Sequence, residues 1–294
     1  MKVLLIGSYL DSVTREVEKK FRVSRLERFG AKKSQREIEN ADVIVINAGT
    51  KIDKRFLGRA KSLKTLITFT HGYDHVDLDA VNARGIKFHT VPGSTPSVVE
   101  LAFGLMIAVL RNIPGLDRRM RRGEWEKGFG RELFGKTLGV IGLGPIGANV
   151  CRIARSFGMN VVACDPNKLM KGELKVSMVS LERLLEISDI VSLHAHLDEK
   201  TEKMIGEREL KRMKKSAILI NTARGGLVDS EALYRALKSG SMAGAGLDVF
   251  EKEPPGKDKL LGLPNVVSTP HAGADTFEGE ERKAEMLIDI LNRL

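Results

Sequence analysis

The chain has 294 residues, of which 42% are hydrophobic and 29 are glycine, and a formal net charge of +10. This length predicts one large or two ordinary domains, and the composition suits an α/β protein with many tight turns. No basic run is interleaved with aromatic residues, and the longest apolar stretch, 98–110, contains Glu100 and is too short to span a bilayer. We therefore expect neither nucleic acid nor a membrane as a partner.

Cysteine and glutamine usage suggests the environment of the protein. The only cysteines, Cys151 and Cys164, provide no disulfide framework, and residues 2–7 are too short for a targeting segment, so we expect a cytoplasmic protein. Gln35 is the only glutamine beside 48 lysines and arginines, which favours a thermophilic source. The basic cluster at residues 118–122 is interpreted as an exposed helix face, with a dimer contact or attraction of anionic substrates as alternatives.

Strand-like apolar runs alternate with helical patterns along the chain. The predicted strands are Val3–Ile6, Val43–Ile46, Leu66–Phe69, Ile86–His89, Thr137–Ile141, Val161–Cys164, Ile190–His194, Ala217–Asn221, Ala245–Val249 and Val266–Ser268. The predicted helices are Ser12–Lys20, Ser97–Arg111, Ser180–Ile187, Glu207–Met213, Ser230–Ser239 and Phe277–Leu291, with Ser180 and Ser230 as N-caps. This alternation predicts parallel sheets that are covered on both faces and joined by right-handed crossovers.

Two prolines and a glycine at 92–96 mark a boundary between two sets of strands. The last helix has an apolar face and follows a second set of strands that is already complete, so we expect it to return to the first set. The predicted organisation is a discontinuous domain, 1–96 with 271–294, and an inserted domain, 97–270.

The most informative motif is Gly142-x-Gly144-x-x-Gly147 between a strand and a helix. Gly142 permits the tight turn, Gly144 allows a pyrophosphate to approach the backbone, and Gly147 allows the helix to pack on the sheet. The helix N-terminus then offers N–H groups to the phosphates. Asp165 ends the next strand, 18 residues after Gly147, where its carboxylate can accept from a ribose diol and would repel a 2′-phosphate. The sequence therefore predicts NAD as cofactor.

A hydride-transfer site also needs an anchor for substrate charge and a proton donor. Arg224 follows a strand of the nucleotide-binding domain, and the glycine pair after it suggests close approach by another group. His271 is the candidate proton donor, and a carboxylate beside its imidazole would favour the protonated form. Glu253 is the candidate partner, with Glu251 as an alternative. The residues show no convincing metal site, since the histidines at 194 and 196 lack clustered ligands.

The chain resembles the D-isomer-specific 2-hydroxyacid dehydrogenases over nearly its full length. The matching segments are residues 72–78, 85–86, 99–101, 122–125, 135–147, 191–194, 218–226, 245–250 and 269–274. The resemblance implies that Arg224, Glu253 and His271 are the catalytic residues, and it selects Glu253 over Glu251. It also implies two Rossmann-like or flavodoxin-like lobes, each with a parallel sheet, and a homodimer with contacts near 97–111 and 122–125.

The resemblance further assigns ligand contacts. A substrate carboxylate would bind at His71 and Gly72 together with Arg224. The cofactor would contact Pro145 and Ile146 as well as the glycines, and the remaining contacts would be His194, His196, Thr222, Ala223, Asp248 and Gly273.

The implied function is an NAD-dependent D-2-hydroxyacid dehydrogenase acting on a small 2-keto acid such as glyoxylate or hydroxypyruvate, or on the corresponding hydroxy acid. Asn47-Ala48 replaces an Arg-Ser pair often found in phosphoglycerate dehydrogenases, which lowers the expectation of a phosphorylated substrate, although Lys51, Lys54 and Arg55 could supply charge. D-3-phosphoglycerate dehydrogenase is therefore the enzymatic alternative. An NAD-sensing corepressor-like interaction protein is the alternative of a different class.

Overall fold

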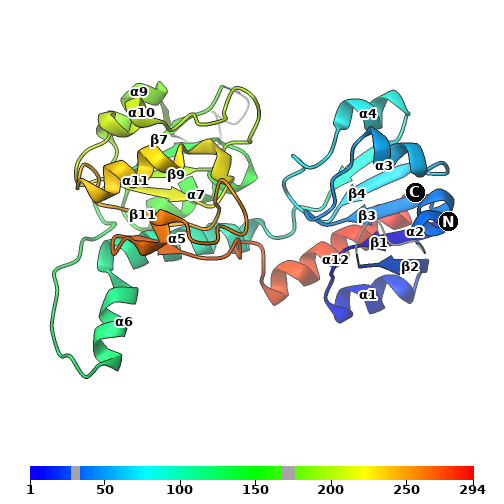
Figure 1. Cartoon of the computed structure of the whole chain (residues 1–294), viewed down its shortest axis with the longest axis horizontal. Coiled ribbons are helices and arrows are strands. Elements are labelled where there is room, and N and C mark those ends of the chain that lie inside the picture. Colours follow the sequence, from blue (N-terminus) through cyan, green and yellow to red (C-terminus); the bar gives the residue numbers. More distant parts are fainter. Residues whose placement is uncertain (28–33, 167–175) are drawn as a thin grey trace. The chain divides into compact units, whose positions relative to one another are not determined.

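The structure, a computed structural model, describes residues 1–27, 34–166 and 176–294. It divides into two compact units, Met1–Thr95 with Asp275–Leu294, and Pro96–Ala274 (Figure 1). The first break lies within one residue of the prediction, but the second lies four residues later than expected. The backbone N–H groups of Ala272 and Gly273 donate to Asp248, so residues 271–274 belong to the second unit. The prediction had assigned these residues to the first domain.

Among the described residues, the first unit contains a parallel sheet in the order β2-β1-β3-β4-β5. Its strands are β1 (Lys2–Ile6), β2 (Arg22–Leu26), β3 (Val43–Ile46), β4 (Thr65–Thr68) and β5 (Lys87–Thr90). Its helices are α1 (Asp11–Glu18), α2 (Ser34–Asn40), α3 (Lys54–Arg59), α4 (Leu78–Ala83) and α12 (Phe277–Asn292). Leu4 packs in the core on one face and Val3 in the core on the other, as expected for a sheet covered on both sides.

The strand β2 was absent from the prediction. It is an edge strand with two exposed arginines, Arg22 and Arg25, so it lacks the apolar run that marks the central strands. The last helix, α12, returns to the first unit as predicted. It places Ala284, Leu287 and Leu291 in the same core as Val3.

The described part of the second unit contains a longer parallel sheet, in the order β12-β11-β10-β9-β6-β7-β8. Its strands are β6 (Thr137–Ile141), β7 (Asn160–Cys164), β8 (Ser177–Met178), β9 (Ile190–Leu193), β10 (Ile218–Asn221), β11 (Gly244–Leu247) and β12 (Val266–Ser268). Because all these pairs are parallel, the segments that leave β6, β9, β10, β11 and β12 share one edge of the sheet. The expected α/β class with parallel sheets is confirmed.

Helices α7, α9, α10 and α11 connect these strands. Their bounds are α7 (Pro145–Ser156), α9 (Leu181–Ile187), α10 (Glu207–Arg212) and α11 (Ser230–Lys238), and short 3-10 turns lie at Gly225–Leu227 and Lys259–Gly262. Ser180 caps α9 by accepting from the Arg183 N–H, as predicted. The prediction for Ser230 was wrong, because Asp229 caps α11 and accepts from the Ala232 N–H. A carboxylate at this position also interacts favourably with the positive end of the helix dipole.

Helix α5 (Thr95–Arg111) buries Ala102, Leu105 and Met106 in the core of the second unit. Helix α6 (Ile113–Arg121) follows and stands away from the rest of this unit in Figure 1. No single helix in the described residues is long and apolar enough to cross a membrane. The pair α5 and α6, bent by 63°, meets that test of length and composition only when taken together.

Candidate active site

The turn from β6 into α7 is shaped by glycine backbone. Gly142 has φ +94°, and a Cβ placed there would lie 2.6 Å from the backbone of His194 and Ala195. A Cβ on Gly147 would lie 2.0 Å from the carbonyl oxygen of Gly142. At Gly144, by contrast, an added Cβ would meet no described heavy atom within 4 Å. The turn is therefore closed on its protein side and open at Gly144, as close approach by a phosphate requires.

Two features at this turn fit the rest of a dinucleotide. Gly144 precedes α7, and Pro145 occupies the first helical position, so the amides of Ile146 and Gly147 lie in the first turn. Asp165 follows β7, and one of its carboxylate oxygens accepts from the Leu143 N–H at 2.6 Å. This bond fixes the acidic side chain beside the glycine turn.

A buried hydroxyl lies where β10 ends. The Oγ1 of Thr222 has no hydrogen-bond partner among the described residues, although Thr222 is only 8% exposed. Its neighbour Ala223 is held by a backbone N–H bond to Asn221 Oδ1, 3.0 Å long. Buried hydroxyls are normally paired, so a polar ligand at this edge would satisfy Thr222. Thr222, the glycine turn and Asp165 together fit a bound dinucleotide.

His194 and His196 differ in environment. The Nε2 of His194 lies 2.8 Å from Ser192 Oγ, and burial lowers the pKa of this imidazole to about 4, so it is neutral at pH 7. His196 is exposed, and its carbonyl oxygen accepts from Thr201 Oγ1 at 2.6 Å. A neutral His194 next to Gly142 can donate or accept a hydrogen bond without adding charge to the turn.

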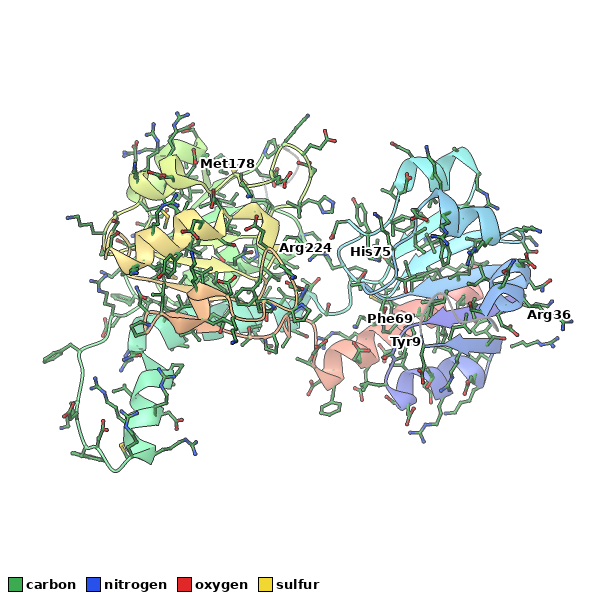
Figure 2. The ribbon with its side chains drawn as sticks, viewed as in Figure 1. Tyr9, Arg36, Phe69, His75, Met178 and Arg224 are labelled. Carbon is green, nitrogen blue, oxygen red and sulfur yellow. The ribbon has the colours of Figure 1, made fainter. Side chains whose placement is uncertain are left out.

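Arg224 lies just beyond the carboxyl end of β10 (Figure 2). Asn221 Nδ2 donates to the Arg224 carbonyl oxygen at 2.9 Å, and the Arg224 guanidinium donates to the Ala223 carbonyl oxygen at 2.8 Å. A Cβ on Gly225 would lie 1.9 Å from the carbonyl carbon of Phe250. The glycine pair was expected to allow close approach, and at Gly225 the approaching group is the backbone of the next loop.

That loop carries Glu253, which contacts His271. Glu253 Oε2 lies 2.7 Å from His271 Nδ1, while Oε1 accepts from the Phe250 N–H at 3.0 Å. The side chains of His271 and Glu253 are 43% and 35% exposed, so the imidazole is open to a substrate. Glu251 instead forms an ion pair with Lys203, 3.0 Å long. The structure thus pairs the predicted Glu253, and not Glu251, with the histidine.

Asp248 holds the segment that contains His271. Its buried carboxylate accepts from Thr269 Oγ1 at 2.5 Å, from the Ala272 N–H at 2.8 Å and from the Gly273 N–H at 2.9 Å. Its carbonyl oxygen accepts from the His271 N–H at 2.8 Å, and His271 itself adopts φ +55°. Asp248 and Gly273 therefore form the frame of the histidine loop. Their contact with a cofactor stays a prediction.

The remaining predicted residues, His71 and Gly72, follow β4 in the first unit, where Thr70 Oγ1 donates to the Gly72 carbonyl oxygen at 2.7 Å. In the described ranges, no three His, Cys, Asp or Glu side chains are grouped to hold a metal ion. Ser192 and Asn221, which support His194 and the Arg224 turn, were not among the predicted site residues. Each is a buried polar residue in a short apolar strand, and that interruption was the available signal.

The chain matches a known family model and several known proteins. Residues 103–273 match the model of the D-isomer specific 2-hydroxyacid dehydrogenase NAD binding domain. A hydroxypyruvate reductase of Thermotoga maritima is 43% identical over 258 residues, which cover 86% of this chain and 84% of the relative. A D-3-phosphoglycerate dehydrogenase of Methanocaldococcus jannaschii is 42% identical over 264 residues, covering 88% of this chain but only 50% of that longer protein.

A solved structure agrees with these sequence relatives. The D-lactate dehydrogenase of Aquifex aeolicus, complexed with NAD and lactic acid, superposes with a TM-score of 0.90 at 32% identity, covering 99% of this chain and 94% of that one. The family model spans more than half of the chain, and it includes the glycine turn, Arg224, Glu253 and His271. This protein therefore belongs to the D-isomer-specific 2-hydroxyacid dehydrogenases, a family of oxidoreductases.

Proposed function

We propose that this chain is an NAD-dependent D-2-hydroxyacid dehydrogenase that reduces a small, unphosphorylated 2-keto acid, such as glyoxylate or hydroxypyruvate, and catalyses the reverse oxidation. The observation that carries the proposal is the 2.7 Å contact between His271 and Glu253 in the unit that also contains the glycine turn. An acid–base pair and a dinucleotide turn at one sheet edge are what carbonyl reduction by hydride transfer requires.

In the reduction, the Arg224 guanidinium binds the substrate carboxylate and polarises the adjacent carbonyl oxygen. His271 donates a proton to that oxygen as negative charge develops on it. Glu253 stabilises the imidazolium and orients the ring through Nδ1, since its own second oxygen is held by the Phe250 N–H. The bound cofactor supplies the hydride. In the oxidation, His271 removes the hydroxyl proton instead.

The preference for NAD over NADP is supported by Asp165. Its carboxylate is held at the end of β7 by the Leu143 N–H, where it accepts from a ribose diol and repels a 2′-phosphate. We expect kcat/KM for NADH to exceed that for NADPH more than about 10-fold. The reason is that the Asp165 carboxylate and the 2′-phosphate of NADPH would repel each other away from bulk water.

The loop after β3 supports an unphosphorylated substrate. Asn47 Oδ1 accepts from the Gly49 N–H and Asn47 Nδ2 donates to the Ser8 carbonyl oxygen, so this residue organises its own loop and brings no positive charge. A phosphorylated substrate, as in the phosphoglycerate dehydrogenase relative, would have to rely on Lys51, Lys54 or Arg55. The enzymatic alternative is therefore tested by including 3-phosphohydroxypyruvate among the substrates.

We further propose that the protein is a homodimer. Trp125 and Phe129 are both more than 70% exposed, on the stretch that follows helix α6, which stands away from the rest of the unit in Figure 1. Large exposed apolar groups on a protruding arm are typical of an interface. Sedimentation equilibrium should give twice the monomer mass of 32.4 kDa, and a monomer at micromolar concentration would reject this assignment.

The test of the function is a kinetic assay of NADH and NADPH oxidation with glyoxylate, hydroxypyruvate, pyruvate, phenylpyruvate and 3-phosphohydroxypyruvate. Arg224→Ala should lower kcat/KM about 10³-fold, because both the carboxylate anchor and the carbonyl polarisation are lost. Arg208→Ala, on the exposed surface of α10, is the matched control and should stay within twofold of the wild type. No turnover of any keto acid by the wild type, or unchanged kinetics in Arg224→Ala, would refute the proposal.

A further inference from the structure

Lys203 lies in the connection between β9 and α10 and contacts the Arg224 turn through its backbone. Its N–H donates to the Gly226 carbonyl oxygen at 2.7 Å, and its own backbone is left-handed, with φ +50°. Two residues later, Ile205 forms a parallel bridge with Val228. The segment 203–205 therefore runs alongside the turn that presents Arg224.

The side chain of Lys203 reaches a different segment. Its Nζ lies 3.0 Å from Glu251 Oε1, and the Glu251 carboxylate raises the pKa of Lys203, so the ammonium is charged across the physiological range. Glu251 directly follows Phe250, whose N–H holds the Glu253 carboxylate in place for His271. Lys203 thus contacts the loop that carries the acid of the acid–base pair.

These two segments also touch each other. A Cβ on Gly225 would lie 2.4 Å from the Glu251 N atom, so the backbones of the Arg224 turn and the Glu253 loop are in direct contact. This contact at Gly225 limits how closely the two segments can approach. The Lys203 backbone bond and the Lys203–Glu251 ion pair add a second connection beside it.

We propose that Lys203 and Glu251 are positioning residues, whose ion pair fixes the arrangement of the Arg224 turn relative to the Glu253–His271 pair. The inference rests on the proposed dehydrogenase function. Lys203 pairs with Glu251, whereas the imidazole pairs with Glu253, so the effect acts through the two loops that carry these residues. Misplacing a proton donor relative to a bound carbonyl lowers turnover more than it lowers binding.

The solvent exposure of the Lys203–Glu251 ion pair limits how much its loss should lower kcat. The Lys203 and Glu251 side chains are 50% and 39% exposed, and an ion pair so open to water is weak. We expect Lys203→Met and Glu251→Gln each to lower kcat about 3- to 10-fold, with KM for the keto acid within twofold of the wild type. The double variant should be no worse than the poorer single variant, because the second change removes a partner that is already lost.

Two further variants separate positioning from general destabilisation. The charge-reversed pair Lys203→Glu with Glu251→Lys should recover kcat to within about twofold of the wild type, since the attraction is restored. Lys211→Met is the matched control, because it breaks another exposed ion pair of the same unit, Lys211–Glu207, and should leave kcat unchanged. Hydrogen exchange of the amides at 225–228 and 250–253 should accelerate in both single variants but not in the control.

The outcomes are decisive for this inference and for the proposed function separately. If the wild type turns over and His271→Asn does not, but both single variants stay within twofold of wild-type kcat, the positioning role is overturned while the function stands. A raised KM with unchanged kcat also overturns it, because the pair would then contribute to binding alone. If the wild type is inactive on every keto acid, the function fails, and unchanged hydrogen exchange in both variants overturns the inference independently.

Discussion

The glycine turn at 142–147 and the cluster of Arg224, Glu253 and His271 lie at the same edge of one sheet, yet they are built differently. The turn is made of backbone, and a single added Cβ at Gly147 would overlap the Gly142 carbonyl oxygen. The cluster is made of half-exposed side chains supported by hydrogen bonds from buried neighbours. Larger side chains in the turn should therefore lower the stability of the fold. Shorter side chains in the cluster should instead lower the rate of the reaction.

The largest expected effect belongs to the cluster. His271→Asn should lower kcat 10²- to 10⁴-fold, because the proton donor is lost, and asparagine tolerates the left-handed backbone of this position. Steady-state kinetics and a thermal melt of the same variant check this. A large loss of kcat with an unchanged melting temperature sharpens the comparison, whereas retained kcat would remove His271 from its assigned role.

The next effect belongs to the turn. Gly147→Ala should lower the free energy of unfolding by about 3 kcal/mol or more, because its Cβ meets a backbone carbonyl that cannot move aside. Gly144→Ala is the matched control, since the same atom meets open space there and should leave urea denaturation unchanged. If Gly144→Ala nonetheless weakens NADH binding about tenfold, a phosphate approaches that residue. Equal stability of the two variants would contradict the distinction.

Glu253→Gln should lower kcat by about 10- to 100-fold, less than the loss of the histidine itself. The amide keeps the shape of the side chain but no longer offsets the charge of a protonated imidazole, an effect typical of residues that orient a reacting group. Glu251→Gln is the comparison, and its smaller loss should separate the two acids. A reversed order would assign the catalytic acid to Glu251.

The smallest effect concerns pH. The pKa of His194 is lowered to about 4 in the folded chain, so below its unfolded value near 6.5 the unfolded state binds more protons and stability falls. Between pH 7 and pH 5 this one group should cost on the order of 2 kcal/mol. Urea denaturation of the wild type and His194→Asn at both pH values measures the difference. Identical pH slopes would show that His194 is not a source of acid sensitivity.

The sequence allowed the turn to be predicted almost completely, because its function depends on glycine spacing within one stretch of chain. The cluster was harder, because 29 residues separate Arg224 from Glu253 and 18 more separate Glu253 from His271. Residue patterns alone left Glu251 open, and only the family resemblance selected Glu253. The structure then supplied the reason, since the Phe250 N–H directs Glu253 toward the histidine while Lys203 pairs with Glu251.

Other differences between prediction and structure have similar physical causes. The edge strand β2 was missed because exposed arginines interrupt its apolar pattern. Asp229 and not Ser230 caps α11, because Ser230 is already the first helical residue and the Asp229 carboxylate accepts from the Ala232 N–H. The break between the units lies four residues later than predicted, because the bonds from residues 271–273 to Asp248 join segments far apart in the sequence.

Those bonds to Asp248 have a broader consequence. They place the whole reacting set, from the glycine turn through the guanidinium to the imidazole, on the uninterrupted stretch Pro96–Ala274. Under the proposed function, specificity for a new acid could evolve through substitutions in the flanking sequence. The residues that transfer hydride and proton would be inherited together on this one stretch.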